Sequence, residues 1–197
     1  MLKFPVLVAA VVVSAAPAVG AEPPLAAISF ADQYNRKQDL SQFNGDVVVV
    51  LYGNRDATTG NNKLGEKIHV FYHPTAKGMT PAQAQRAPVI RVPDSKDGMR
   101  SPEVRVVPVE CVGKVPDLIK NYTRLRIRKE VPDSMVLIDF DNSMKERFTL
   151  KEGETNMLVV DSTGHIRLKV NGELDPPTFN RVIHTIDFLR KEAAERR

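Results

Sequence analysis

The sequence has 197 residues, with 28 Lys and Arg against 24 Asp and Glu, and a formal net charge of +4. This length suits one compact domain and is too short for two domains with cores of their own, and so mixed a charge does not indicate a nucleic-acid-binding protein. Cys111 is the only cysteine, which excludes an internal disulfide, so the fold must depend on its apolar core.

Residues 1–21 have the three parts of a secretory signal peptide. Lys3 supplies the positive charge, residues 4–13 form a short apolar segment, and residues 14–21 are small side chains that a signal peptidase accepts. The apolar segment is too short to cross a bilayer as a stable helix. Cleavage is expected after Ala21, with cleavage after Gly20 as the alternative, and no cysteine follows either site, so no lipid anchor is expected. We therefore predict a single domain over residues 22–197, periplasmic or secreted and without a membrane anchor.

The first half of this domain mixes extended and helical patterns. Residues 30–43 predict a short strand or hairpin, and the continuous apolar run 47–52 predicts a central strand that is buried on both faces. A helix that ends before Pro74 follows, and its apolar stripe is Leu64, Ile68, Phe71 and Tyr72. Residues 75–103 are rich in proline and predict an irregular, partly disordered insertion.

The second half has four further strand patterns and two helices. The strands are predicted at 104–112, 135–140, 157–161 and 166–170, and the first helix at 117–129. Asp175 is placed to cap the final helix, whose apolar stripe is Phe179, Val182, Ile183, Ile186 and Leu189. This order predicts an α/β domain with a mixed central sheet flanked by helices.

The order of elements resembles the thioredoxin-like fold over most of the domain. In redox-active members of that fold, a Cys-x-x-Cys motif follows the first central strand and a cis-proline precedes the late hairpin. Here residues 52–62 contain no sulfur, and residues 152–156 contain no proline. The resemblance therefore implies the fold without its usual thiol apparatus.

The chain is also similar to the YtfJ family of bacterial periplasmic proteins, which are thioredoxin-like, exported and without the paired cysteines. The matching segments are residues 53–59, followed by a helix, residues 152–166 and residues 171–176. The insertion at 75–103 has no counterpart in the family. The resemblance implies a periplasmic protein and supplies no activity.

The polar loop at residues 54–61 is the candidate binding site. Backbone donors at a helix N-terminus suit a carboxylate or a phosphate, and Arg55 would be the charge partner of such a ligand. Plain helix capping explains the same residue types and is favoured. The predicted binding residues are Asn54, Arg55, Asp56, Thr58 and Thr59.

Cys111 is the candidate for thiol chemistry. Its position in an apolar strand favours a buried and inert thiol, because free cysteine is among the most buried residue types. The alternative is a one-cysteine, redoxin-like oxidoreductase or peroxidase. Such an enzyme needs Cys111 exposed beside a cation, and Lys114 is the near candidate in sequence.

The histidines do not indicate a metal site. His69 and His73 stand four residues apart, which can place two imidazoles on one helix face, but two ligands do not complete a zinc coordination shell. His165 and His184 are expected to face solvent. No metal and no cofactor is predicted.

Two further charged groups have simpler interpretations. Asp139 and Asp141 could serve acid-base chemistry, but the sequence around them is first a turn signal. A dense basic run is interpreted as a solvated face in preference to a site for anionic lipid or an acidic partner, and it consists of Arg124, Arg126, Arg128 and Lys129.

The leading hypothesis is therefore an exported, noncatalytic thioredoxin-like domain that binds a protein or a small ligand. The alternative is the thiol enzyme that uses Cys111, and a third hypothesis is a structural envelope protein without a ligand. The sequence names neither the ligand nor the oligomeric state.

Overall fold

The structure is a computed structural model that describes residues 24–25, 28–93 and 98–196. The expected signal segment, residues 1–21, and the expected cleavage point lie outside these residues. In the part of the chain that is described, no helix is both long and apolar enough to cross a membrane.

Seven strands form one mixed sheet in the order β2-β1-β5-β4-β3-β6-β7. The strands are β1 (Ser29–Asp32), β2 (Lys37–Asp39), β3 (Val47–Gly53), β4 (Val104–Cys111), β5 (Leu137–Asp139), β6 (Asn156–Val160) and β7 (Ile166–Asn171). β3, β4 and β5 run parallel, whereas β1 and β6 are antiparallel to the strands beside them. The mixed sheet and the early hairpin agree with the sequence-based expectation.

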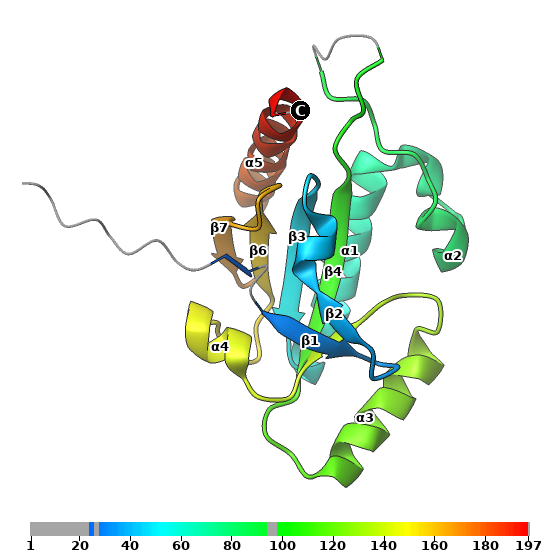
Figure 1. Cartoon of the computed structure of the whole chain (residues 1–197), viewed down its shortest axis with the longest axis vertical. Coiled ribbons are helices and arrows are strands. Elements are labelled where there is room, and N and C mark those ends of the chain that lie inside the picture. The colour runs from blue at the N-terminus through cyan, green and yellow to red at the C-terminus, as the bar shows by residue number, and fades with distance from the viewer. Residues whose placement is uncertain (1–23, 26–27, 94–97, 197) are drawn as a thin grey trace, which may run out of the picture.

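Helices lie on both faces of the sheet (Figure 1). They are α1 (Thr58–Tyr72), α2 (Pro81–Ala84), α3 (Asp117–Glu130), α4 (Ser143–Phe148) and α5 (Pro176–Glu195). One core lies between the sheet and the helices α1 and α5, and a second lies between the opposite face, α4 and the N-terminal residues Leu25 and Ile28. The helix α3 covers β5 through Ile127, which packs with Ile138.

The central strand β3 explains this two-sided core. All of its residues are buried, as the continuous apolar run predicts. Because side chains alternate along a strand, Val48 and Val50 join the core under α4, while Val47 and Val49 join the core under α1 and α5. The sheet is thereby anchored on both faces at the strand that leads to the candidate site.

The helix α1 ends before Pro74 as predicted, but it begins at Thr58, within the predicted polar loop 54–61, and it has a different apolar face. Ile68 and Tyr72 are buried, whereas Phe71 is 46% exposed, so the placement of Phe71 in the buried stripe is wrong. Neighbouring positions diverge by about 100° around a helix, and it is Tyr72 that faces inward. Its hydroxyl donates to the Ile183 carbonyl (3.2 Å) and to the Asp187 carboxylate (3.1 Å), which joins α1 to α5.

The described residues of the proline-rich insertion are fastened to the core. The Arg190 side chain of α5 is 1% exposed and donates to the carbonyls of Ile90 (2.5 Å) and Pro102 (3.0 Å). Ala87 and Val92 are buried. The described residues of the insertion are thus largely irregular and are attached to the core.

The end of the chain follows the sequence closely. β6 and β7 form the predicted hairpin. The Asp175 carboxylate accepts a hydrogen bond from the Thr178 amide (2.8 Å) and caps α5, and the whole predicted stripe of α5 is buried. The strand β5 is shorter than predicted, because the amide of Val136 donates to the Gln33 side chain (3.0 Å).

Candidate functional site

The candidate site lies where the parallel strands end. β3 ends at Gly53, β4 at Cys111 and β5 at Asp139, and the antiparallel strand β6 begins beside them at Asn156. We call this region the C-terminal sheet edge. In α/β sheets, ligands bind at the carboxyl ends of the parallel strands, so a ligand site is expected at this edge.

The loop after β3 is built by capping. The Asn54 side-chain oxygen accepts hydrogen bonds from the amides of Asp56 (3.1 Å) and Ala57 (3.4 Å), at the start of the 3-10 turn Arg55–Ala57. The Thr58 hydroxyl donates to the Asn54 carbonyl (3.4 Å). Asn54 therefore caps the 3-10 turn before α1, whereas α1 itself begins after Ala57 without the side-chain cap that the sequence favours. The Asp56 carboxylate stands in the first turn of the 3-10 segment, close to the start of α1.

The turn after β3 is tightly packed against the first residues of α1 and against the loop before β6. A Cβ placed on Gly53 would lie 2.6 Å from the Ala57 Cβ and 2.9 Å from the side-chain nitrogen Nδ2 of Asn61, so only glycine fits there. A Cβ on Gly60 would lie 3.1 Å from the Thr155 hydroxyl. The first turn of α1 is thus in close approach to the loop before β6, which is where the cis-proline of redox-active thioredoxin-like proteins would lie. No cis peptide bond occurs among the described residues.

The predicted binding residues differ in their accessibility. Arg55, Asp56 and Thr59 are exposed, whereas Asn54 and Thr58 are partly buried. The capping role of Asn54 explains its burial. The surface of this loop therefore offers one cation, one carboxylate and one hydroxyl to a ligand.

A partly buried ion pair lies next to the strand end that carries this loop. Glu110 of β4, whose register partner is Gly53, pairs with Arg126 of α3. Burial raises the pKa of Glu110, while the charges of Arg126 and, more weakly, Arg55 act in the opposite direction. The pair thus connects the predicted loop to α3, a connection that the sequence did not indicate.

Cys111 lies at the same sheet edge, but its side chain packs on the opposite face, against the core under α4. It is partly buried, and its thiol donates to the Asn142 side-chain oxygen (3.3 Å). Burial raises the pKa of the Cys111 thiol and the Asp139 charge adds to this, against a smaller opposite effect from Tyr52 and Lys145. The nearby cation is thus Lys145 and not the Lys114 that the sequence suggested.

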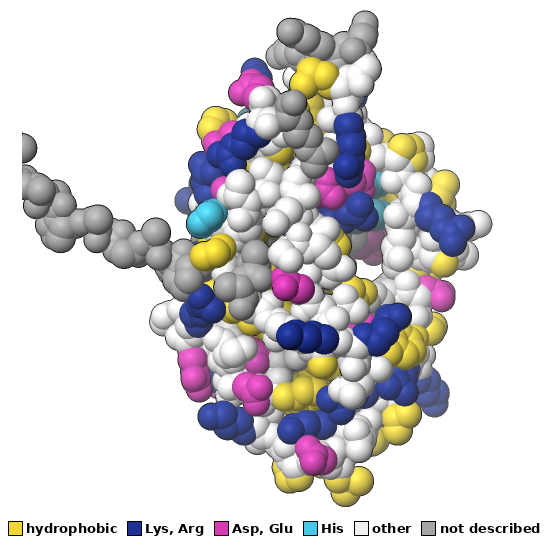
Figure 2. Space-filling model, viewed as in Figure 1, with side chains coloured by type: hydrophobic (Ala, Val, Ile, Leu, Met, Phe, Trp, Pro, Cys, Tyr) yellow, Lys and Arg dark blue, Asp and Glu magenta, His cyan; other side chains and the backbone are white. Residues whose placement is uncertain are grey.

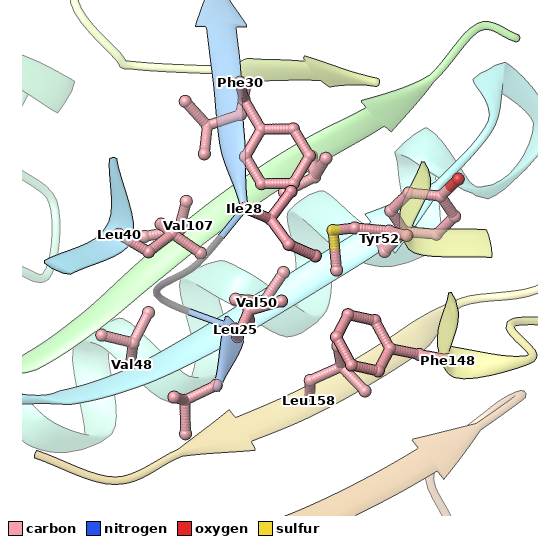
Figure 3. Packing of buried hydrophobic residues seen from close by; sticks show 14 of the residues in the cluster. Leu25, Ile28, Phe30, Leu40, Val48, Val50, Tyr52, Val107, Phe148 and Leu158 are labelled. Atoms are coloured by element: carbon pink, nitrogen blue, oxygen red, sulfur yellow. The ribbon is translucent and has the colours of Figure 1, made fainter. Parts of the chain in front are cut away.

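Beneath Cys111 lies a buried polar contact that sequence reasoning missed. The Tyr52 hydroxyl donates to the Asp139 carboxylate (3.2 Å), and burial raises the pKa of Tyr52. Figure 3 shows the Tyr52 ring among the core side chains, with its hydroxyl pointing away from the other labelled residues. Asp139 also accepts from the amides of Asp141 (3.2 Å), Ser143 (3.0 Å) and Met144 (3.0 Å). Asp139 therefore builds the turn into α4, in agreement with the turn interpretation.

The two adjacent histidines hold the insertion in place. His69 and His73 are stacked with ring centroids 4.3 Å apart. His69 interacts with the Ala84 carbonyl (3.1 Å) and His73 with the Ala87 carbonyl (3.0 Å). Among the described residues, no group of three or more His, Cys, Asp or Glu side chains could hold a metal ion. His165 and His184 are exposed, as predicted.

The basic run on α3 is not the solvated face that the sequence suggested. Arg126 pairs with both Glu110 and Glu130. Arg128 donates to the Gln33 carbonyl (2.7 Å), and the Arg124 guanidinium lies over the Phe140 ring, 4.9 Å from its centroid. The interpretation is wrong because planar guanidinium groups can pack against rings and donate to buried acceptors while their stems cover apolar surface. Only Lys129 of the four is exposed.

No protein-family model and no curated protein sequence matches the chain. Solved structures do resemble it. An uncharacterized thioredoxin-like protein from Porphyromonas gingivalis has a TM-score of 0.53 and 14% identity, over 85% of this chain and 92% of its own. A proposed protein disulfide isomerase from Bacteroides thetaiotaomicron has a TM-score of 0.52 and 12% identity, over 90% and 94%. A proposed thiol-disulfide oxidoreductase from Bacteroides vulgatus has a TM-score of 0.50 and 13% identity, over 87% and 91%.

These likenesses, at such low identity, concern the fold alone. The chain has a thioredoxin-like α/β fold with a seven-stranded mixed sheet flanked by helices, which confirms the predicted fold class. The resemblance to the YtfJ family stays a prediction.

Proposed function

We propose that this chain is an exported thioredoxin-like protein that binds a protein segment or a small polar ligand at the C-terminal sheet edge, without thiol chemistry. One observation carries the proposal. The loop that holds paired cysteines in redox-active members is here a hydrogen-bonded polar turn capped by Asn54, and the single thiol of the chain, Cys111, is bonded to Asn142 on the other face of the sheet.

The chemistry of the loop favours a particular kind of ligand. The Asp56 carboxylate already lies in the first turn before α1, where it benefits from the positive end of the helix dipole and disfavours a second anion. Arg55 and Thr59 add donors on the exposed surface. A ligand with both donors and acceptors, such as an extended peptide segment, therefore fits better than a phosphate.

The environment of Cys111 does not favour the alternative enzyme. Thiol chemistry proceeds through the thiolate, and here burial raises the pKa of Cys111, with only partial opposition from Tyr52 and Lys145. Lys145 is in addition paired with Glu152. The chain has no second cysteine to resolve an oxidised intermediate.

The proposed location follows from residues 1–21 and agrees with what resemblance to the YtfJ family implies. Cell fractionation followed by N-terminal sequencing tests it. We expect a periplasmic or secreted chain that begins at Glu22. A chain that stays in the cytoplasm and retains Lys3 would contradict export while leaving the binding proposal open to its own test.

Site-specific photocrosslinking tests the binding proposal. A photoreactive amino acid in place of Thr59, in the full chain and its native envelope, should give a discrete adduct. The matched control carries the same group in place of His184, an exposed position on α5, and should give none. The substitution Arg55→Glu should remove the adduct at position 59. Equal adducts at both positions, or none at either, would contradict the proposal.

A further inference from the structure

The helix α3 exposes an apolar stripe that no other part of the described chain covers. Leu118 is 79% exposed, Tyr122 64% and Leu125 61%. Their spacings of four and three residues place them on one face of the helix, and Lys129 continues that face by four more. Ile119, which is 43% exposed, lies at its margin. We call Leu118, Tyr122, Leu125 and Lys129 the outer stripe.

An ordinary surface helix turns its apolar face to the core and its charged side chains to solvent. In α3 much of this distribution is reversed. Only Thr123 and Ile127 of α3 are buried. Arg124 and Arg126 turn toward the protein, where they meet Phe140 and Glu110. Arg124 and Arg126 are thus used within the chain, whereas four large apolar side chains of α3 are left exposed.

The surface around α3 reflects this arrangement. Figure 2 shows hydrophobic side chains next to Lys and Arg side chains at the lower end of the molecule, where Figure 1 places α3. Contiguous apolar patches with a polar margin mark interaction surfaces, whereas scattered exposed apolar residues do not. Four of the large exposed hydrophobic residues lie on this single helix.

We propose that the outer stripe pairs with the same stripe of a second copy of this chain, with the two α3 helices antiparallel. The distribution of charge along α3 argues for this occupant. Asp117 lies in the first turn, and Lys129 lies exposed in the last turn. Glu130, which is also at that end, is already paired with Arg126 of its own helix. An antiparallel pair with two-fold symmetry brings Asp117 of each helix near Lys129 of the other, and the helix dipoles also oppose favourably.

The register follows from the spacing of the stripe. When the two-fold axis passes between positions 123 and 124, Tyr122 of each copy meets Leu125 of the other. Leu118 then lies under the aliphatic stem of Lys129, whose ammonium reaches toward Asp117. The Asp117 side chain is 90% exposed and bonds only Lys120 of its own helix among the described residues, so it can accept a second cation.

The size of the patch sets the strength of the pairing. Stable specific interfaces bury roughly 1,200–2,000 Å² in total, and a single pair of short helices buries less than that. We therefore expect a reversible dimer with a dissociation constant between about 1 µM and 1 mM. This pairing is independent of the binding proposed at the C-terminal sheet edge.

Sedimentation equilibrium of the purified chain across that concentration range tests the inference. The unchanged chain should pass from monomer to dimer. Leu125→Glu should raise the dissociation constant at least about tenfold, because an aliphatic anchor is replaced by a charge at the centre of the pair. Phe188→Glu is the matched control, since Phe188 is equally exposed on α5, and it should leave the dissociation constant unchanged.

A charge exchange tests the antiparallel register. Asp117→Lys and Lys129→Asp should each weaken the dimer, and the double variant should recover it, with far-UV circular dichroism confirming that all three variants are folded. A chain that stays monomeric at every concentration overturns the proposal. So does a dimer that tolerates Leu125→Glu, or a monomer that sediments with anionic lipid vesicles and loses this in Leu125→Glu, which would assign the stripe to a membrane surface.

Discussion

The substitution Gly53→Ala probes the tight turn that carries the candidate site. The added methyl would lie 2.6 Å from the Ala57 Cβ and 2.9 Å from the side-chain nitrogen Nδ2 of Asn61, whereas nonbonded carbon atoms prefer about 3.5–4.0 Å. The Ala57 Cβ cannot rotate away, so the backbone of the turn has to move. Overpacking of this kind costs about 1–3 kcal/mol, and a lower unfolded-state entropy returns up to about 1 kcal/mol. We expect a net loss of about 2 kcal/mol.

Urea unfolding followed by far-UV circular dichroism measures this loss. With an m-value of about 2 kcal/mol/M, the midpoint should fall by about 1 M, and the melting temperature should fall by about 4–8 °C. Gly60→Ala is the matched control, because its methyl would meet only the Thr155 hydroxyl, at 3.1 Å, and would favour the helix. Its stability should change by less than about 0.5 kcal/mol. An unchanged midpoint in Gly53→Ala, or an equal loss in both variants, would refute the reasoning.

Three further predictions concern ionisable groups. Burial raises the pKa of Asp161, but hydrogen bonds from Thr163 and Arg167 outweigh this and hold the pKa at about 2. The ionised Asp161 therefore stabilises the folded chain by about 2 kcal/mol above about pH 5, and this stabilisation is lost as the pH falls through the folded-state pKa. Asp161→Asn should flatten the dependence of the unfolding free energy on pH between about pH 2 and 5, and an unaltered dependence would count against this assignment. Cys111 should react with a chromogenic disulfide reagent at pH 8 at least about tenfold more slowly in the folded chain than in denaturant. Equal rates would show an accessible thiol and a faster folded rate an activated one, and either result would contradict this prediction. Asp139→Ala should lower the free energy of unfolding by about 3 kcal/mol or more, because it leaves several buried donors unpaired; urea titration would disprove this with a loss below about 1 kcal/mol.

The sequence predicts those parts of the fold in which local pattern and tertiary packing agree. The run 47–52 is continuous and apolar because β3 is buried on both faces. The helix α5 combines a cap at Asp175, prolines in its first turn and a full apolar stripe, and each of these features has its expected place. Such elements can be predicted without knowing which other elements they pack against.

The errors arise where a partner lies far away in the sequence. Arg128 meets the Gln33 carbonyl 95 positions earlier, and Tyr52 meets Asp139 87 positions later. No local pattern encodes such contacts, so arginines that pack inward were interpreted as solvated. The strand β5 is short for a similar reason, since the Val136 amide bonds to Gln33 and not to a neighbouring strand.

The candidate site was predicted in its composition but not in its setting. The polar residues after β3 could be derived from residue types alone, whereas the residue that forms the cap, Asn54, and the 3-10 turn that it caps could not. Gly60 approaches Thr155, and Glu110 stands in register with Gly53. Both placements depend on how β3, β4 and β6 align. The sequence therefore located the loop, and the topology of the sheet supplied the surface around it.

The central claim is that the polar loop, and not the thiol, is the working part of this protein. Photocrosslinking from position 59 in the native envelope tests it most directly when Arg55→Glu and Cys111→Ser are compared in parallel. We predict that the adduct is lost in Arg55→Glu and retained in Cys111→Ser. An adduct that survives Arg55→Glu and disappears in Cys111→Ser would contradict the account.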